Sequence, residues 1–125
     1  MSPERDTTSP SPEAAARLKT DVKTAPDRAD VALRGELDLA TLPVAERAVE
    51  GVDKATKTLV LDLRKLTFID SSGLRLILTT AEEWQDGGRR LFVIQGPAQV
   101  ERVLELTGAG ARLNVIEDPS LIKAA

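Results

Sequence analysis

The chain has 125 residues with 17 basic and 20 acidic side chains, a formal net charge of −3, and neither histidine nor cysteine. The missing cysteines exclude disulfides and thiolate metal sites, and the missing histidines exclude a Ser-His-Asp hydrolase. Contacts to phosphate groups need clustered lysine and arginine, so we expect no nucleic acid as a partner. No apolar run approaches the ~20 residues of a membrane span, so we expect no membrane association and a cytoplasmic location.

The N-terminal part predicts a tail followed by a hairpin. Residues 1–14 are rich in serine, threonine and proline, so we expect a disordered tail without a signal peptide. Residues 15–125 then form one domain. Apolar and polar residues alternate over 18–22 and again over 31–35, with a turn signal at 25–27 between them. This pattern predicts an antiparallel pair of strands at one end of a sheet.

Helical and strand patterns alternate through the middle of the chain. Apolar residues recur every three or four positions over 41–52, which predicts a helix with Thr41 as its cap. Residues 59–63 are almost continuously apolar, as in a strand covered on both faces. We expect a turn at residues 68–70, and a helix after it that buries one stripe of residues 74–84.

The C-terminal part repeats this alternation. We expect a strand at residues 91–94, a helix that starts at Gly96-Pro97 and is followed by Gly108, a short strand at 113–116, and a terminal helix that starts with Asp118 and Pro119. The order β-β-α-β-α-β-α-β-α predicts an α/β fold with a single mixed, mostly parallel sheet of about five strands and helices alternating along the chain.

Asp70, Ser71 and Ser72 lie where the buried strand leads into the next helix. The first-turn amides of a helix point outward with partial positive charge, so this position suits a functional or modified hydroxyl. A serine here can equally be an ordinary helix cap. Asp38 is expected at the same end of the sheet, and two carboxylates with a serine could bind Mg²⁺ or act as a general base. Turn capping by Asp38 and partner contact by Asp70 are the simpler interpretation, because nothing else in the chain completes a metal site.

Three motifs resemble the STAS domains, and more narrowly the bacterial anti-sigma factor antagonists. Residues 59–74, which end in Asp-Ser-Ser-Gly-Leu, look like the signature of that family. The Gly-Glu-Leu-Asp of residues 35–38 matches its turn after the second strand, and the Glu-Leu-Thr-Gly of residues 105–108 matches a late helix end. The resemblance covers roughly residues 16–122 and implies a STAS-like fold.

The resemblance implies a switch rather than an enzyme. The unphosphorylated chain would bind an anti-sigma factor, itself a GHKL-type serine kinase, and so release a sigma factor. Phosphorylation of the serine directly after Asp70, which is Ser71, would abolish this binding, and a PP2C-type phosphatase would reset it. The resemblance implies no cofactor, no metal and no catalytic residue. Choosing Ser71 over Ser72 rests on the resemblance.

We expect the partner-binding surface to surround this serine. Gly73 lacks a Cβ and would let a partner approach Ser71 closely, although turn chemistry also explains a glycine there. Leu76 lies off the expected buried stripe, beside Arg75 and Thr80, and could anchor a partner, although isolated exposed leucines are common. The full expected set is Asp38, Asp70, Ser72, Gly73, Leu74, Arg75 and Leu76.

Two other classes of function compete with the switch. Similar domains serve in stress-signalling scaffolds and as accessory subunits of lipid-transport complexes, so an interaction module of another complex is the alternative. An enzyme with Ser71 as nucleophile would need a base, and no lysine or carboxylate has the spacing to supply one. Nucleotide binding is disfavoured because the chain lacks a Gly-Lys-Ser/Thr loop.

Overall fold

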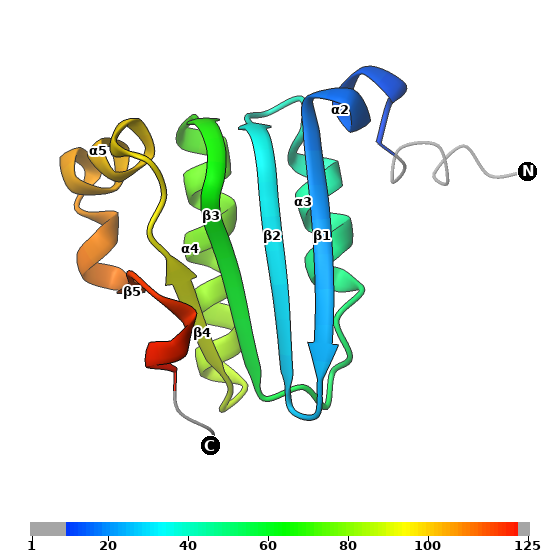
Figure 1. Cartoon of the computed structure of the whole chain (residues 1–125), viewed down its shortest axis with the longest axis vertical. Coiled ribbons are helices and arrows are strands. Elements are labelled where there is room, and N and C mark those ends of the chain that lie inside the picture. The colour runs from blue at the N-terminus through cyan, green and yellow to red at the C-terminus, as the bar shows by residue number, and fades with distance from the viewer. Residues whose placement is uncertain (1–9, 123–125) are drawn as a thin grey trace, which may run out of the picture.

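The computed structural model describes residues 10–122 and contains one five-stranded sheet (Figure 1). The strands lie in the order β1-β2-β3-β4-β5, with β1 antiparallel to β2 and all other pairs parallel. The elements are α2 (Pro12–Arg17), β1 (Leu18–Ala25), β2 (Arg28–Leu37), α3 (Leu42–Glu50), β3 (Thr58–Ile69), α4 (Ser71–Asp86), β4 (Arg90–Ile94), α5 (Ala98–Thr107), the 3₁₀ turn η1 (Ala109–Arg112), β5 (Asn114–Ile116) and the 3₁₀ turn η2 (Pro119–Leu121). The predicted α/β class, the mostly parallel sheet and the N-terminal hairpin are therefore confirmed.

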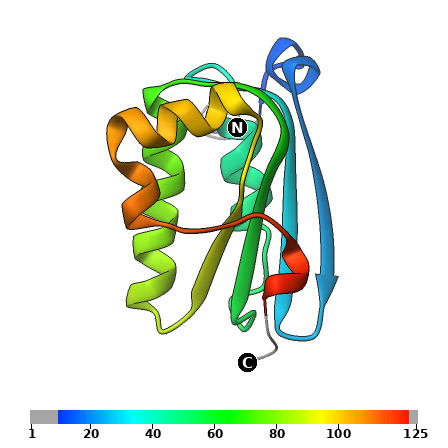
Figure 2. The ribbon, with the colours of Figure 1, turned by 60° about the vertical axis from the view of Figure 1, so that its left-hand side comes forward.

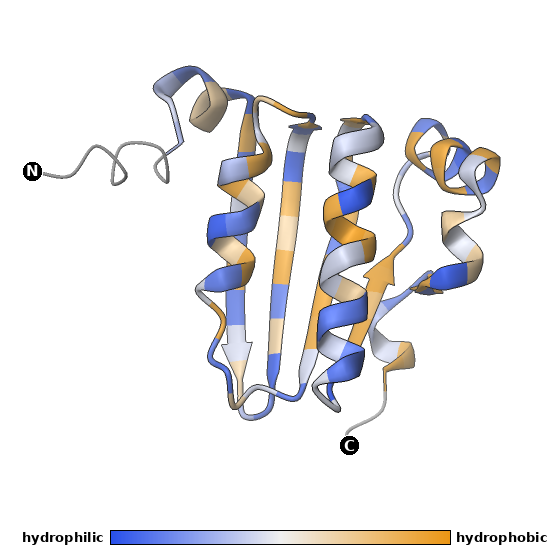
Figure 3. Ribbon diagram, turned by 180° about the vertical axis from the view of Figure 1, so that it is seen from behind, coloured by the Kyte–Doolittle hydropathy of each residue, from blue (hydrophilic) through white to orange (hydrophobic). Residues whose placement is uncertain are grey.

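Helices α3 and α4 lie side by side on one face of the sheet, as Figure 2 shows from the side and Figure 3 from behind. Successive side chains of a strand point to opposite faces, so alternate residues of β2 reach these helices. Ala29, Val31 and Leu33 are each at most 2% exposed and share a core cluster with Ala45 of α3 and Ile77 of α4. This packing fixes both helices against the sheet, and with them the ends that carry the site.

Strand β3 runs through the middle of the sheet and is longer than predicted. Residues 59–61 are at most 2% exposed, as expected of a strand covered on both faces. The predicted turn at residues 68–70 is wrong, because Ile69 still pairs with Leu37 of β2 in the parallel ladder. Asp70 is therefore the first residue after the strand, and no loop separates the strand from helix α4.

The N-terminal boundary also differs from the prediction. Part of the expected tail of residues 1–14 is helical, because α2 begins at Pro12, and residues 1–9 of that tail lie outside the described residues. The Ser11 hydroxyl accepts a hydrogen bond from the Ala14 amide at 3.1 Å, and Ala14 is only 2% exposed. A six-residue helix is not stable on its own, so α2 depends on this cap and on packing against the domain.

Two smaller predictions change as well. The terminal helix is a single 3₁₀ turn, η2, in which the Asp118 carboxylate accepts from the Ser120 amide at 2.8 Å. Thr80, expected beside Leu76 off the buried stripe, is only 5% exposed and donates its hydroxyl hydrogen to the Leu76 carbonyl at 2.7 Å. Within residues 10–122, no helix is long and apolar enough to span a membrane.

Candidate functional site

The ends of strands β2 and β3 are joined by hydrogen bonds that bring two distant segments together. The Asp70 amide donates to the Leu37 carbonyl at 3.1 Å, and the Leu39 amide donates to the Asp70 carboxylate at 3.2 Å. Asp38 and Asp70 therefore lie at the same edge of the sheet, as the sequence predicts for two parallel strands. The turn after β2 and the first turn of α4 form one continuous surface.

Asp70 is the N-cap of helix α4. Its carboxylate accepts the Gly73 amide at 3.0 Å and the Ser72 hydroxyl at 2.6 Å. Burial alone would raise the pKa of Asp70, but the hydrogen bonds from Ser72, Gly73 and Leu39 outweigh it and hold this pKa below its ordinary value. Because Asp70 takes the capping role, neither serine is needed as a cap.

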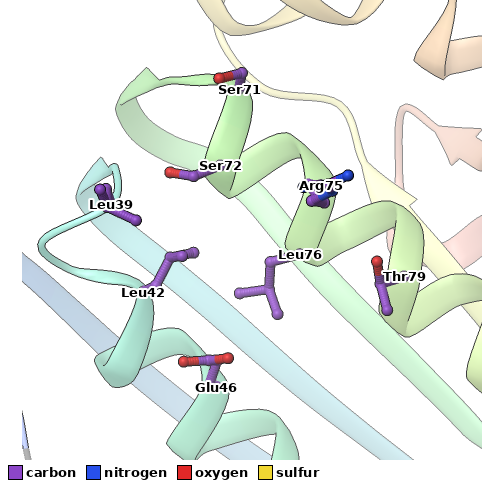
Figure 4. Close-up of a pocket in the computed structure, with 8 residues that line it drawn as sticks. All are labelled: Leu39, Leu42, Glu46, Ser71, Ser72, Arg75, Leu76 and Thr79. Atoms are coloured by element: carbon purple, nitrogen blue, oxygen red, sulfur yellow. The ribbon is translucent and has the colours of Figure 1, made fainter.

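The hydroxyls of the two serines therefore have different surroundings. Ser71 is the first residue of α4, its side chain is exposed, and no described residue hydrogen-bonds to its hydroxyl. Ser72 is half-buried and its hydroxyl is held by Asp70. Figure 4 shows Ser71 at the tip of the helix and Ser72 one position inside, directed toward Leu39. Of the two hydroxyls, that of Ser71 is the one open to another molecule.

Asp38 has a structural role in the turn that leads into helix α3. Its carboxylate accepts the Thr41 amide at 3.1 Å and also binds the Arg17 guanidinium. Burial would raise the pKa of Asp38, and the bonds from Arg17 and Thr41 lower it below its ordinary value. Thr41 occupies the N-cap position of α3, but its side chain makes no capping hydrogen bond. Its hydroxyl oxygen instead accepts the Asp38 amide at 2.9 Å, and the hydroxyl donates to the Glu36 carbonyl at 2.8 Å.

The carboxylates of Asp38 and Asp70 are thus both engaged by donors within the protein. In the described part of the chain, no three acidic, cysteine or histidine residues gather where they could hold a metal ion. Among residues 10–122, no such cluster forms a magnesium site beside Ser71, and no side chain hydrogen-bonds to the Ser71 hydroxyl as a base would. Both carboxylates instead shape the backbone around Ser71.

Two of the expected partner-binding residues are buried. Gly73 faces the sheet, where a Cβ would lie 2.7 Å from Leu37 Cγ and 3.0 Å from the Leu37 carbonyl oxygen. Leu74 is 6% exposed and belongs to the core cluster. The expectation that Gly73 opens a path for a partner is therefore corrected: it lets helix α4 approach the end of β2. Asp38, Asp70, Ser72, Arg75 and Leu76 retain some exposed surface.

A hollow of about 570 Å³ opens beside Ser71, between the start of α3 and residues 71–79 of α4 (Figure 4). Leu39, Leu42 and Leu76 supply its apolar lining. Leu39 is 71% exposed, which is unusual for a large apolar side chain next to a polar helix tip. The full lining is Leu39, Leu42, Glu46, Ser71, Ser72, Arg75, Leu76 and Thr79. The sequence analysis missed Leu39, although an apolar residue inside a polar turn could have drawn attention to it.

Known proteins share this architecture. The family model described as "Mlab, STAS domain" matches residues 20–117. An "Anti-sigma-B factor antagonist" of Staphylococcus aureus (strain NCTC 8325 / PS 47) is 26% identical over 89 residues, which are 70% of this chain and 82% of that protein. The crystal structure of an anti-sigma factor antagonist from Mycobacterium paratuberculosis has a TM-score of 0.76 at 24% identity, and the match covers 88% of this chain and 92% of that one.

Two solved structures of the antagonist SpoIIAA, one unphosphorylated and one phosphorylated, are also similar to this chain. Its unphosphorylated form gives a TM-score of 0.63 at 21% identity, covering 81% of this chain and 90% of that one. The phosphorylated form of the Bacillus protein gives 0.62 at 19% identity, covering 81% and 94%. These structural likenesses show a common fold. Because the family match extends from β1 to β5, across the whole sheet and the Ser71 junction, the chain belongs to the STAS domain family.

Proposed function

We propose that this chain is an anti-sigma factor antagonist whose binding to its partner is switched by phosphorylation of Ser71. The observation that carries the proposal is the difference between the two serines. Ser71 presents an exposed hydroxyl without a hydrogen bond from any described residue, whereas the Ser72 hydroxyl donates to Asp70 at 2.6 Å. A kinase would have to break that bond to use Ser72, but it can reach Ser71 directly.

The hollow beside Ser71 supports the proposal that one phosphate controls binding. A partner that covers Ser71 also covers Leu39 and Leu76, whose exposed apolar surface favours association. A phosphate adds about 1.5–2 negative charges next to the Asp70 carboxylate. Burying this charge without a dedicated cation in the interface would cost several kcal/mol. Since ~1.4 kcal/mol is a tenfold change in affinity, such a cost is enough to disrupt a micromolar complex.

The fold itself need not change when Ser71 is modified. Ser71 is the first residue of α4, where the helix dipole favours a negative charge. The side chain is exposed, so a phosphate would displace no packed group. The unphosphorylated and the phosphorylated forms of SpoIIAA both share the fold of this chain, with TM-scores of 0.63 and 0.62, which supports a switch that leaves the fold in place.

The partners follow from the likeness to antagonists of anti-sigma factors. We propose an anti-sigma factor of the GHKL serine-kinase type as the binding partner, and a PP2C-type phosphatase as the enzyme that removes the phosphate. In this scheme the chain acts by binding and is not itself a catalyst, and its setting is the cytoplasm, where sigma factors work.

Phosphorylation and binding can be tested together. The protein is incubated with candidate anti-sigma kinases and ATP, and the phosphate is mapped by mass spectrometry. We expect phosphate on Ser71, loss of anti-sigma binding in Ser71→Asp, and retained binding that cannot be switched off in Ser71→Ala. Ser72→Ala is the matched control, because it removes the neighbouring hydroxyl and should still be phosphorylated.

Two outcomes would contradict the proposal. Phosphate found only on Ser72 would refute the site assignment. Absence of modification, with equal binding by wild type and Ser71→Asp, would refute the switch and favour an interaction module of another complex, such as a stress-signalling scaffold or a lipid-transport accessory subunit.

A further inference from the structure

Helix α2 lies outside the family match but contacts the candidate site. The match begins at residue 20, whereas α2 ends at Arg17. The Arg17 guanidinium lies 2.8 Å from the Glu36 carboxylate and also binds the Asp38 carboxylate. One cation therefore holds two carboxylates at the end of β2, immediately before the turn that carries Leu39. In Figure 1, α2 is seen at the edge of the sheet beside the start of β1.

The position of Arg17 is set by packing as well as by charge. Ala14 and Leu18, on either side of it, are 2% and 1% exposed. Gly35 of β2 has φ +116°, and a Cβ at this glycine would collide with the Arg17 carbonyl oxygen. The backbone of Arg17 thus lies directly on β2, and its side chain has a short path to Asp38.

A continuous set of bonds leads from Arg17 to the Ser71 surface. Asp38 binds Arg17 with one carboxylate oxygen and the Thr41 amide with the other. The next residue, Leu39, donates its amide to Asp70, and its side chain lines the hollow beside Ser71. The orientation of Asp38 therefore influences where the Leu39 side chain lies.

We propose that Arg17 is a positioning residue: through Asp38 it holds the turn of residues 38–41 in the form that presents Leu39 to a partner, so that helix α2 raises the affinity of the Ser71 surface. The effect on the turn stands independently of any partner, and the effect on affinity rests on the proposed function. Without Arg17, the carboxylates of Glu36 and Asp38 would repel each other two residues apart, and the turn would populate forms that a partner cannot bind.

The expected effect of replacing Arg17 is modest because its side chain is partly exposed. Exposed ion pairs are individually weak, and one cation that bridges two carboxylates lies at the upper end of their range. We therefore expect Arg17→Gln to increase local opening by about threefold to tenfold, and to weaken partner affinity by up to that factor. One nitrogen of the Arg17 guanidinium, Nη2, contacts both carboxylates. Arg17→Lys keeps a positive charge on a shorter side chain, so its effect should be smaller than that of Arg17→Gln.

The first test is amide hydrogen exchange of the full chain, measured by NMR at Leu39 and Thr41. Arg17→Gln should exchange about threefold to tenfold faster at both amides, with Arg17→Lys in between. Arg34→Gln is the matched control: it removes the same charge from an exposed position on β2 that makes no ion pair with a described residue. Equal exchange in Arg17→Gln, Arg34→Gln and wild type would overturn the positioning role.

The second test is the affinity for an anti-sigma factor that binds the wild-type chain. Arg17→Gln should bind more weakly, by at most the factor by which exchange accelerates, because affinity falls only as the binding-competent population of the turn falls. Arg34→Gln should bind as wild type. Unchanged affinity in Arg17→Gln would overturn the effect on the partner. If no anti-sigma factor binds wild type, the proposed function fails, while the exchange measurement still decides whether Arg17 positions the turn.

Discussion

Replacing Gly73 by alanine tests whether this glycine serves packing or access. A Cβ at Gly73 would lie 2.7 Å from Leu37 Cγ and 3.1 Å from Leu37 Cδ2. Carbon atoms in ordinary contact are about 3.5–4.0 Å apart, so α4 or β2 must move by several tenths of an ångström. Leu37 is fully buried and also accepts the Asp70 amide through its carbonyl, so neither side can move freely.

The magnitude follows from two opposing contributions. Forcing an extra methyl group into a packed core costs about 1–3 kcal/mol, and replacing glycine by alanine in a helix returns up to about 1 kcal/mol. Because the atoms in contact are a branch point and backbone rather than a mobile side-chain end, we expect Gly73→Ala to lower the free energy of unfolding by about 1–2 kcal/mol. For a domain of this size the midpoint temperature should fall by about 3–10 °C.

The assay is urea unfolding followed by the fluorescence of Trp84, the chain's one tryptophan, which is 5% exposed in the folded protein. The midpoint should fall with an unchanged slope. Gly110→Ala is the control, because a Cβ there meets no heavy atom within 4 Å, and its stability should be equal or higher. A Gly73→Ala protein as stable as wild type that nevertheless loses partner binding would refute the packing argument and support access.

Three further predictions concern charge. Asp70→Asn should lower the free energy of unfolding by about 0.3–1 kcal/mol at neutral pH. Because the folded-state pKa of Asp70 lies below its unfolded value of about 3.9, this stabilisation is complete above that pH and is lost as pH falls through the folded pKa. The free energies of unfolding of wild type and Asp70→Asn, measured by urea titration, should therefore converge in acid. A difference that stays constant with pH would contradict the lowered pKa of Asp70. Phosphoserine installed at Ser71 should show a higher second pKa in Arg75→Gln than with Arg75 present, since residues four apart on a helix face each other; phosphorus NMR measures this, and equal values would exclude the pair. Arg89→Gln should lower the free energy of unfolding by about 0.5–1 kcal/mol, because the Arg89 guanidinium lies 3.8 Å from the centre of the Trp84 ring. Unchanged stability would show that this stacking contributes nothing.

The alternation of elements could be predicted because it depends on local pattern. The continuous apolar run at 59–63 predicts a strand covered on both faces, and the apolar stripe over 74–84 has the period of a helix buried on one face. The strand ends were less predictable. Ile69 belongs to β3 only because Leu37 lies beside it, and that pairing joins residues far apart in the chain.

The candidate site shows the same division. The position of Asp70, Ser71 and Ser72 at a strand-helix junction follows from the sequence, but two adjacent serines have nearly equal local propensities. The two hydroxyls differ because the Asp70 carboxylate, which caps the helix by accepting the Gly73 amide, also accepts the Ser72 hydroxyl. Gly73 could not be interpreted locally, since the atom that excludes a side chain there belongs to Leu37.

The sequence by itself determined the α/β class, the order of the strands along the chain and the polar junction at Ser71, because burial periodicity and motif spacing are properties of neighbouring residues. Only the tertiary structure decided which serine is free, why Gly73 has no side chain, and that a short helix before β1 reaches the site through Arg17. A six-residue helix has too few residues to show a period and is too short to be stable alone. Its stability depends on packing against the rest of the domain in addition to its Ser11 cap, and no local pattern encodes that packing.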